Sequence, residues 1–247
     1  EALKAVSLTV RAGEMVGIAG VDGSGQRELF WAVMGLLRPT GGSATLLGEP
    51  LFELSVADRL KRGMRLTPED RHAEGVVEEW SLIDNGLLGL QRRPEFLRGG
   101  WMDRSHATSH ATAIADRFKT KHGALTDPMR SLSGGNQQRF VAARALQSEP
   151  KLLLAFQPAR GLDIEATRQV YAGIAEACAN GAAALIVSYD LDELIDQCDR
   201  VDIVAHPKLG AEEGVAVWRG GEEVICRDGA PQFGPDGPRR EFQLRKE

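Results

Sequence analysis

Residues 131–139 read Ser-Leu-Ser-Gly-Gly-Asn-Gln-Gln-Arg and lead into a helix-like stretch at 136–147. A serine hydroxyl and two glycine N–H groups at a helix N-terminus can clamp a terminal phosphate, because the helix dipole is positive there. The simpler interpretation is a serine N-cap with two glycines before an ordinary helix. Gln137, Gln138 and the spacing to the next motif favour the phosphate-binding interpretation.

A glycine-rich loop lies far upstream, between a short apolar strand-like segment at 15–19 and a helix-like segment at 26–34. This is the context of a phosphate-binding P-loop, G-x-x-x-x-G-K-[ST]. Gln26 stands where the phosphate-binding lysine belongs, and Arg27 stands where the Mg²⁺-binding serine or threonine belongs. An ordinary strand-to-helix turn is the alternative. The candidate residues of this degenerate loop are Gly20, Gly23, Ser24, Gly25, Gln26 and Arg27.

A second apolar run, at 152–156, ends in Phe156-Gln157-Pro158 and is followed by Gly161-Leu-Asp163. This segment resembles the strand of P-loop ATPases whose terminal carboxylates hold Mg²⁺ and orient an attacking water. Phenylalanine cannot bind a metal, and glutamine can orient a water but cannot accept its proton. The position therefore predicts impaired catalysis and no metal ligand.

Composition sets the broad class. The chain has 247 residues, is 43% hydrophobic and carries a formal net charge of −5. This suffices for one large domain or two small ones with a buried core, and it excludes a disordered tail or a disulfide scaffold. The acidic balance argues against a dedicated nucleic-acid-binding protein. No apolar run approaches the ~18–20 residues of a membrane-spanning helix. The three cysteines favour free thiols: Cys178, Cys198 and Cys226.

Strand-like and helix-like segments alternate, which predicts an α/β fold with a mostly parallel sheet. We expect an α/β core from residues 1–75 and 146–205, with a helical insert at 76–145 between them. Within the insert we expect helices at 82–90, 103–119 and 136–147 and a polar loop at 92–100. Residues 206–247 form a C-terminal extension of unclear role, with strand-like stretches at 214–218 and 222–226 and a loop or tail at 229–240.

One helix face carries Asp103, His106 and His110, with the histidines four residues apart. This spacing could bind a metal. The segment is polar nearly all round, so a solvated helix face is the preferred interpretation and no metal site is assigned.

Together these segments resemble the ABC-type ATPases. The stretch at 132–136 resembles their signature motif, LSGGQ, and the candidate signature residues are Ser133, Gly134, Gly135, Asn136 and Gln137. Glu69 lies where these ATPases carry the Q-loop glutamine, and Tyr189 replaces the switch histidine. Phe156 and Gln157 occupy the positions of the metal-binding aspartate and the catalytic glutamate. Asp163 matches the D-loop.

More narrowly, the chain is similar to the second, often degenerate, cassette of the tandem ATPase subunits of bacterial sugar and nucleoside importers. The resemblance implies a P-loop NTPase (RecA-like) core with a mostly parallel sheet, an antiparallel β edge and an inserted helical subdomain. It also implies ATP as the ligand, with Mg²⁺ doubtful at this domain's own site. The absence of an initial Met agrees with a piece cut from a tandem chain.

The implied partners are a second cassette in the same full-length chain, membrane permease subunits and, indirectly, a periplasmic or lipoprotein solute-binding protein, with no nucleic acid. The implied location is peripheral, at the cytoplasmic face of the membrane. Two alternatives stay open: a competent ATPase in which Arg27 supplies the missing positive charge, and a non-transport ABC ATPase.

Overall fold

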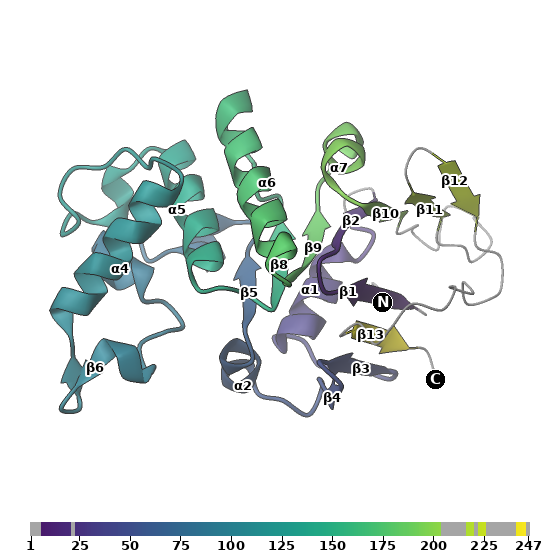
Figure 1. Ribbon diagram of the computed structural model, residues 1–247, viewed down its shortest axis with the longest axis horizontal. Coiled ribbons are helices and arrows are strands. Elements are labelled where there is room, and N and C mark those ends of the chain that lie inside the picture. Colours follow the sequence, from purple (N-terminus) through teal and green to yellow (C-terminus); the bar gives the residue numbers. More distant parts are fainter. Residues whose placement is uncertain (1–5, 21–22, 204–215, 220–221, 226–240, 246–247) are drawn as a thin grey trace.

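A computed structural model describes residues 6–20, 23–203, 216–219, 222–225 and 241–245 (Figure 1). A seven-stranded sheet forms its centre, in the order β12-β11-β10-β2-β9-β8-β5. Five neighbouring strands, β10 through β5, are parallel, and β11 and β12 continue the sheet as an antiparallel edge. The strands are β2 (Met15–Ala19), β5 (Met64–Thr67), β8 (Leu152–Phe156), β9 (Ala183–Val187), β10 (Arg200–Ile203), β11 (Ala216–Arg219) and β12 (Glu222–Ile225).

Both faces of the parallel sheet are covered, which explains why β2, β8 and β9 are buried at every residue. Alternate side chains of these strands enter two separate cores. One core contains residues of α5 (Gly134–Gln147), α6 (Ile164–Ala179) and α7 (Leu191–Gln197). The other contains residues of α1 (Gln26–Met34) and of a second, antiparallel sheet. The predicted α/β class with a mostly parallel sheet is confirmed.

The second sheet has the order β1-β13-β3-β4, and all its pairs are antiparallel. Its strands are β1 (Leu8–Arg11), β3 (Ser43–Leu46), β4 (Glu49–Pro50) and β13 (Glu241–Arg245). β13 lies between β1 and β3, so the end of the expected C-terminal extension is an inner strand of this sheet (Figure 1). The strand-like stretches at 214–218 and 222–226 correspond to β11 and β12. The expected loop at 229–240 lies outside the described residues.

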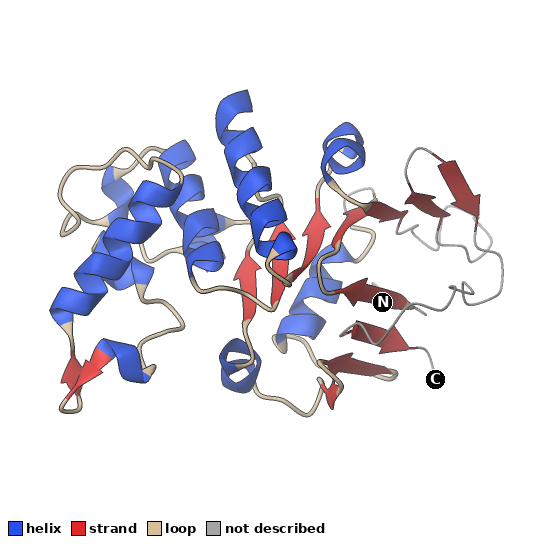
Figure 2. Ribbon diagram, in the orientation of Figure 1, coloured by secondary structure: helices blue, strands red, loops and turns tan. Residues whose placement is uncertain are grey.

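The helical part occupies the end of the molecule opposite β11 and β12 (Figure 2). A small core of its own joins α3, η2 and α4. Its elements are η1 (Arg71–Gly75), α3 (Leu82–Gly86), η2 (Pro94–Phe96), β6 (Leu97–Arg98), β7 (Trp101–Met102), α4 (Arg104–Arg117), η3 (Met129–Ser131) and α5. None of the helices among the described residues has the length and hydropathy of a membrane span.

Two expectations for this part are wrong. The helix expected at 82–90 ends at Gly86, and Gly89 then takes a left-handed φ of 81° that breaks the helical path. The Asn85 amide also donates hydrogen bonds to the carbonyls of Val77, Trp80 and Ser81, which holds this short helix against the preceding loop. The expected loop at 92–100 contains η2 and β6, because β6 pairs with β7 as a small hairpin.

The helix that follows the glycine loop, α1, is held at its C-terminal end by a buried arginine. Arg59, in α2 (Val56–Lys61), donates from Nη1 to the carbonyls of Ala32 and Val33 at 2.8 and 2.6 Å. These are carbonyls that a helix end leaves without a partner in its own helix. Gly35 ends α1 with a φ of 84°, and a Cβ there would lie 2.8 Å from Arg59 Cζ. The C-terminal end of α1 is therefore fixed by Gly35, its own C-cap, and by Arg59 of α2.

Gly35→Ala should lower the free energy of unfolding by about 2–3 kcal/mol, from left-handed strain plus the contact with Arg59. Gly181→Ala is the matched control, because Gly181 has a φ of 91° and nothing within 4 Å of a built Cβ. It should lose only about 1 kcal/mol. Urea denaturation followed by circular dichroism measures both, and equal losses would contradict the role given to Arg59.

Candidate functional site

The glycine loop at the end of β2 has the backbone of a helix-opening loop. Gly23 and Gly25 take φ values of 82° and 101°, which favour glycine, and Gly25 is the N-cap of α1. Ser24 and Gln26 are 1% and 2% exposed. Ser24 Oγ has no hydrogen-bond partner among the described residues. Gly20 precedes the loop, and positions 21 and 22 lie outside the described residues.

Arg27, the second residue of α1, is bound to Glu69 at the end of β5. Arg27 Nε lies 2.9 Å from Glu69 Oε2, and Nη2 of the same guanidinium reaches the same oxygen. The hydrogen bond to Glu69 raises the pKa of Arg27. The guanidinium also lies over the Trp31 ring, 5.8 Å from its centroid. The P-loop position and the Q-loop position are therefore joined by an ion pair.

Glu69 collects further groups from other loops. Its side chain is only 12% exposed. Tyr189, which follows β9, places its hydroxyl 3.5 Å from Glu69 Oε1, and Arg160 Nη1 lies 4.0 Å from the same oxygen. Three of the predicted site residues, Arg27, Glu69 and Tyr189, thus meet at one carboxylate.

Phe156, the last residue of β8, fills the adjacent space with an aromatic contact on each side. Its ring lies 5.5 Å from that of Phe30 in α1 and 6.1 Å from that of Tyr189, both edge to face. Phe156 is 3% exposed. Phe156, which was expected to offer no metal ligand, is part of an aromatic cluster.

Gln157 follows directly and has a strained backbone. Its φ of 49° is uncommon for a residue with a side chain, and its N–H donates to the Val187 carbonyl at 2.8 Å. Its carbonyl accepts from the Arg160 N–H at 3.0 Å. The Gln157 Nε2 atom is buried and has no partner among the described residues. The strain is held by the pairing of β8 with β9.

The groups around Glu69 do not suit Mg²⁺, which prefers several oxygen ligands in near-octahedral geometry at 2.0–2.1 Å. Glu69 is already paired with Arg27, and Phe156 offers no ligand atom. The described part of the chain contains no group of three His, Cys, Asp or Glu that could hold a metal ion. The histidine face of α4 has another role: His106 and His110 both pack edge-on against Phe96 at 5.0 Å.

The predicted signature residues form a separate, more exposed group at the start of α5. Ser133 is the N-cap of α5 and is exposed. Its Oγ accepts a hydrogen bond from Asn136 Nδ2 at 2.9 Å, and Asn136 Oδ1 accepts from the Lys121 N–H. A Cβ at Gly134 would lie 2.5 Å from Arg71 Nη2. Glycine at 134 therefore leaves room for the Arg71 guanidinium beside the helix start.

Side chains of α5 tie this group to the loop after β8. Gln138, 2% exposed, donates from Nε2 to the Pro158 carbonyl at 2.9 Å. Arg139 Nη2 lies 3.1 Å from Asp163 Oδ2. Asp163 also caps α6 by accepting from the Ala166 N–H at 2.7 Å, a bond that lowers the pKa of Asp163. The D-loop residue is thus fixed between two helices.

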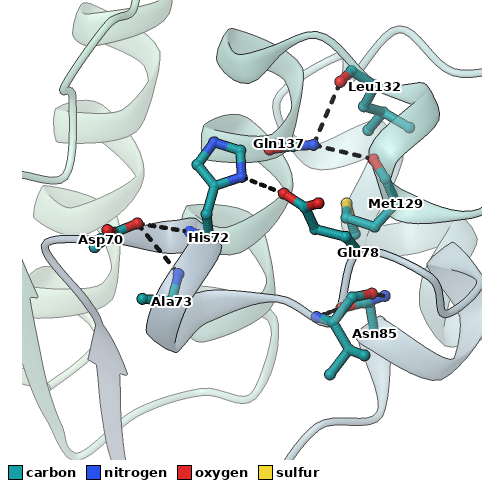
Figure 3. Close-up of polar contacts among 9 residues, drawn as sticks. Asp70, His72, Ala73, Glu78, Asn85, Met129, Leu132 and Gln137 are labelled. Carbon is teal, nitrogen blue, oxygen red and sulfur yellow. Dashed lines mark hydrogen bonds and ion pairs between the residues drawn. The ribbon is translucent and has the colours of Figure 1, made fainter.

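Figure 3 shows separate sets of polar contacts in the segment after Glu69 and at the start of α5. Asp70 accepts from the backbone N–H groups of His72 and Ala73, and His72 Nδ1 lies 2.6 Å from Glu78 Oε1. Gln137, buried at 3% exposure, donates to the carbonyls of Met129 and Leu132 just before the signature (Figure 3). Gln137 is therefore an inner support of the signature turn.

Three residues that contact the candidate site were not selected from the sequence: Arg160, Gln138 and Arg139. Arg160 joins the Glu69 cluster, and the other two link α5 to the loop after β8. No charge or motif pattern in the sequence marked these three residues as contacts of the site. The opposite charges of Arg27 and Glu69 are a signal for that pair alone.

Comparisons with known proteins identify the family to which this chain belongs. The family model described as ABC transporter matches residues 3–159. The nucleoside import ATP-binding protein NupA of Lactococcus lactis subsp. cremoris is 35% identical over 202 residues, covering 82% of this chain and 40% of NupA. The arabinose import ATP-binding protein AraG of Burkholderia pseudomallei is 36% identical over 236 residues, covering 94% of this chain and 46% of AraG. The chain thus spans less than half the length of these two relatives.

Solved structures show the same fold. The ATP-binding cassette MJ0796, in a dimeric post-hydrolysis state bound to ADP and Pi, matches with a TM-score of 0.72 at 21% identity, and the match covers 92% of each chain. The architecture is therefore that of an ABC ATPase cassette. The chain belongs to the ABC transporter family, and it is similar to the ATP-binding proteins of nucleoside and sugar import systems.

Proposed function

We propose that the chain is the second, catalytically degenerate cassette of an ATPase subunit in a bacterial sugar or nucleoside importer. The observation that carries this is the Arg27–Glu69 ion pair beside Phe156, at positions where an active cassette binds Mg²⁺. Gln157 in place of a carboxylate base would by itself slow hydrolysis by ~10²–10⁴-fold. The cassette's own site then has a regulatory or structural role.

The signature residues, unlike those of the cassette's own site, match the motif of an active cassette. We assign them to the site of a partner cassette. Ser133 is exposed at a helix N-terminus, its oxygen oriented by Asn136, and Gly134 and Gly135 add no side chain there. Such a surface can complete a phosphate site built by another cassette. Asp163, fixed by Arg139, would carry the contact between the two cassettes.

The partner cassette belongs to the same full-length chain in this proposal, which the length of the curated relatives supports. Residues 1–75 and 146–205 form the nucleotide-binding core, and residues 76–145 form the helical subdomain that carries the signature. The assembly sits peripherally on the cytoplasmic face of the membrane, bound to permease subunits and served by a solute-binding protein. Two other functions are alternatives. The ATPase assay described below tests whether the chain is a competent ATPase. A pull-down with membrane permease subunits tests whether it is a non-transport ABC ATPase.

The purified chain should show no Mg²⁺-dependent ATP hydrolysis above a protein-free blank. The reason is the combined loss of the P-loop lysine, the metal ligands and the base. A coupled-enzyme ATPase assay measures this. Sustained turnover that disappears in Gln157→Ala would establish the competent-ATPase alternative.

Ser133→Arg should abolish ATP hydrolysis by the assembled transporter, because a bulky cation would occupy the phosphate-facing surface of the signature. Ser109→Arg is the matched control: Ser109 is exposed on α4 and bonds only locally, to the Ser105 carbonyl at 3.1 Å. It should hydrolyse ATP at the wild-type rate. Equal rates for wild type and Ser133→Arg would refute the assignment of the signature to a partner site.

A further inference from the structure

At the two positions that would hold Mg²⁺ in a complete site, this chain has residues that contribute new contacts. In P-loop NTPases the loop serine or threonine and a carboxylate at the end of a neighbouring strand hold Mg²⁺ beside the phosphates. Here these two positions are Arg27 and Phe156. The guanidinium of Arg27 brings a positive charge of its own to the place where the missing ligands would have held one.

Arg27 is positioned there by several contacts. Two of its nitrogens reach Glu69 Oε2, one of them at 2.9 Å, and its face lies on Trp31. The Glu69 side chain is only 12% exposed, whereas that of Arg27 is 48% exposed, so the carboxylate is shielded while the guanidinium stays open to a ligand from solvent. Glu69 also faces Arg160 at 4.0 Å, so two guanidinium groups share one carboxylate.

The neighbouring loops leave two buried polar atoms without partners among the described residues. One is Ser24 Oγ in the glycine loop, on a side chain that is 1% exposed, and the other is Gln157 Nε2 after β8. Both can donate a hydrogen bond to a phosphate oxygen. Buried donors without partners are costly, so a ligand that accepts from them would be favoured. The N-terminus of α1 adds backbone N–H groups to the same loop.

These groups accept an anion and repel a cation. Mg²⁺ would approach two guanidinium groups and find one carboxylate that is already paired. A phosphate chain, by contrast, matches the fork of an arginine. We propose that this site binds a nucleoside triphosphate as its metal-free anion, with Arg27 neutralising the charge that Mg²⁺ neutralises in a complete site. This inference rests on the proposed function, since it describes what the degenerate site still does.

Isothermal titration of the chain with ATP tests this, in one buffer with EDTA and in another with excess Mg²⁺. We expect binding in EDTA, and about tenfold weaker binding with Mg²⁺, because MgATP brings a cation towards Arg27. Arg27→Ala should weaken binding in EDTA by about tenfold, the effect of one charge-assisted contact. Glu69→Gln should tighten it several-fold, because the guanidinium is then freed from its competing carboxylate. A role of Glu69 in structure alone would not produce a gain.

Arg62→Ala is the matched control for Arg27→Ala. Arg62 also pairs with a glutamate, Glu49, at 2.6 Å, but on the surface between α2 and β4. The Arg62→Ala variant should bind ATP as the wild type does. Circular dichroism verifies that each variant is folded. Binding that requires Mg²⁺, or that Arg27→Ala leaves unchanged, overturns the inference. ATP binding in neither buffer also overturns it but leaves the degenerate cassette in place, whereas Mg²⁺-dependent hydrolysis by the chain alone would overturn the proposed function itself.

Discussion

Parallel pairing in the buried sheet is the constraint on which the site depends. The strands β5, β8, β9 and β2 run in one direction, and their carboxyl ends are aligned almost residue for residue: Thr67 is opposite Ala155, and Phe156 and Ile18 are both opposite Val187. The loops that follow parallel strands leave the sheet at the same edge. Residues from four distant parts of the chain are therefore delivered to one place, whatever their side chains are.

What the side chains are then decides the chemistry of that place. A half-buried carboxylate such as Glu69 needs a cation, and without a metal the nearest solution is a guanidinium. Arg27 supplies it from α1, while Phe156 fills the space of a lost ligand by packing against Phe30 and Tyr189. Arg27, Glu69, Tyr189 and Phe156 contact one another in series, so they form one connected cluster.

The start of α5 is supported from the same edge of the sheet. Gln138 binds the Pro158 carbonyl, and Arg139 binds Asp163, so two successive residues of α5 hold the loop after β8. Arg71, two residues after Glu69, lies beside Gly134. The exposed serine at the start of α5 is thus only a few bonded or packed groups away from Gln157 and from Glu69.

The sequence by itself determined the class of fold, the order of the motifs and the identity of the family, because these follow from local patterns: apolar strands, glycine loops and a serine-glycine helix start. It also identified the substituted positions one by one. Only the tertiary structure decided that Arg27, Glu69 and Tyr189 meet, that Arg160 joins them, and that residues 241–245 form an inner strand between β1 and β3. Contacts between residues 42 or 120 positions apart depend on how strands pair and pack, and a local pattern carries no information about that pairing. The bonds from the Asn85 side chain to carbonyls of Val77, Trp80 and Ser81 are likewise invisible to a local pattern.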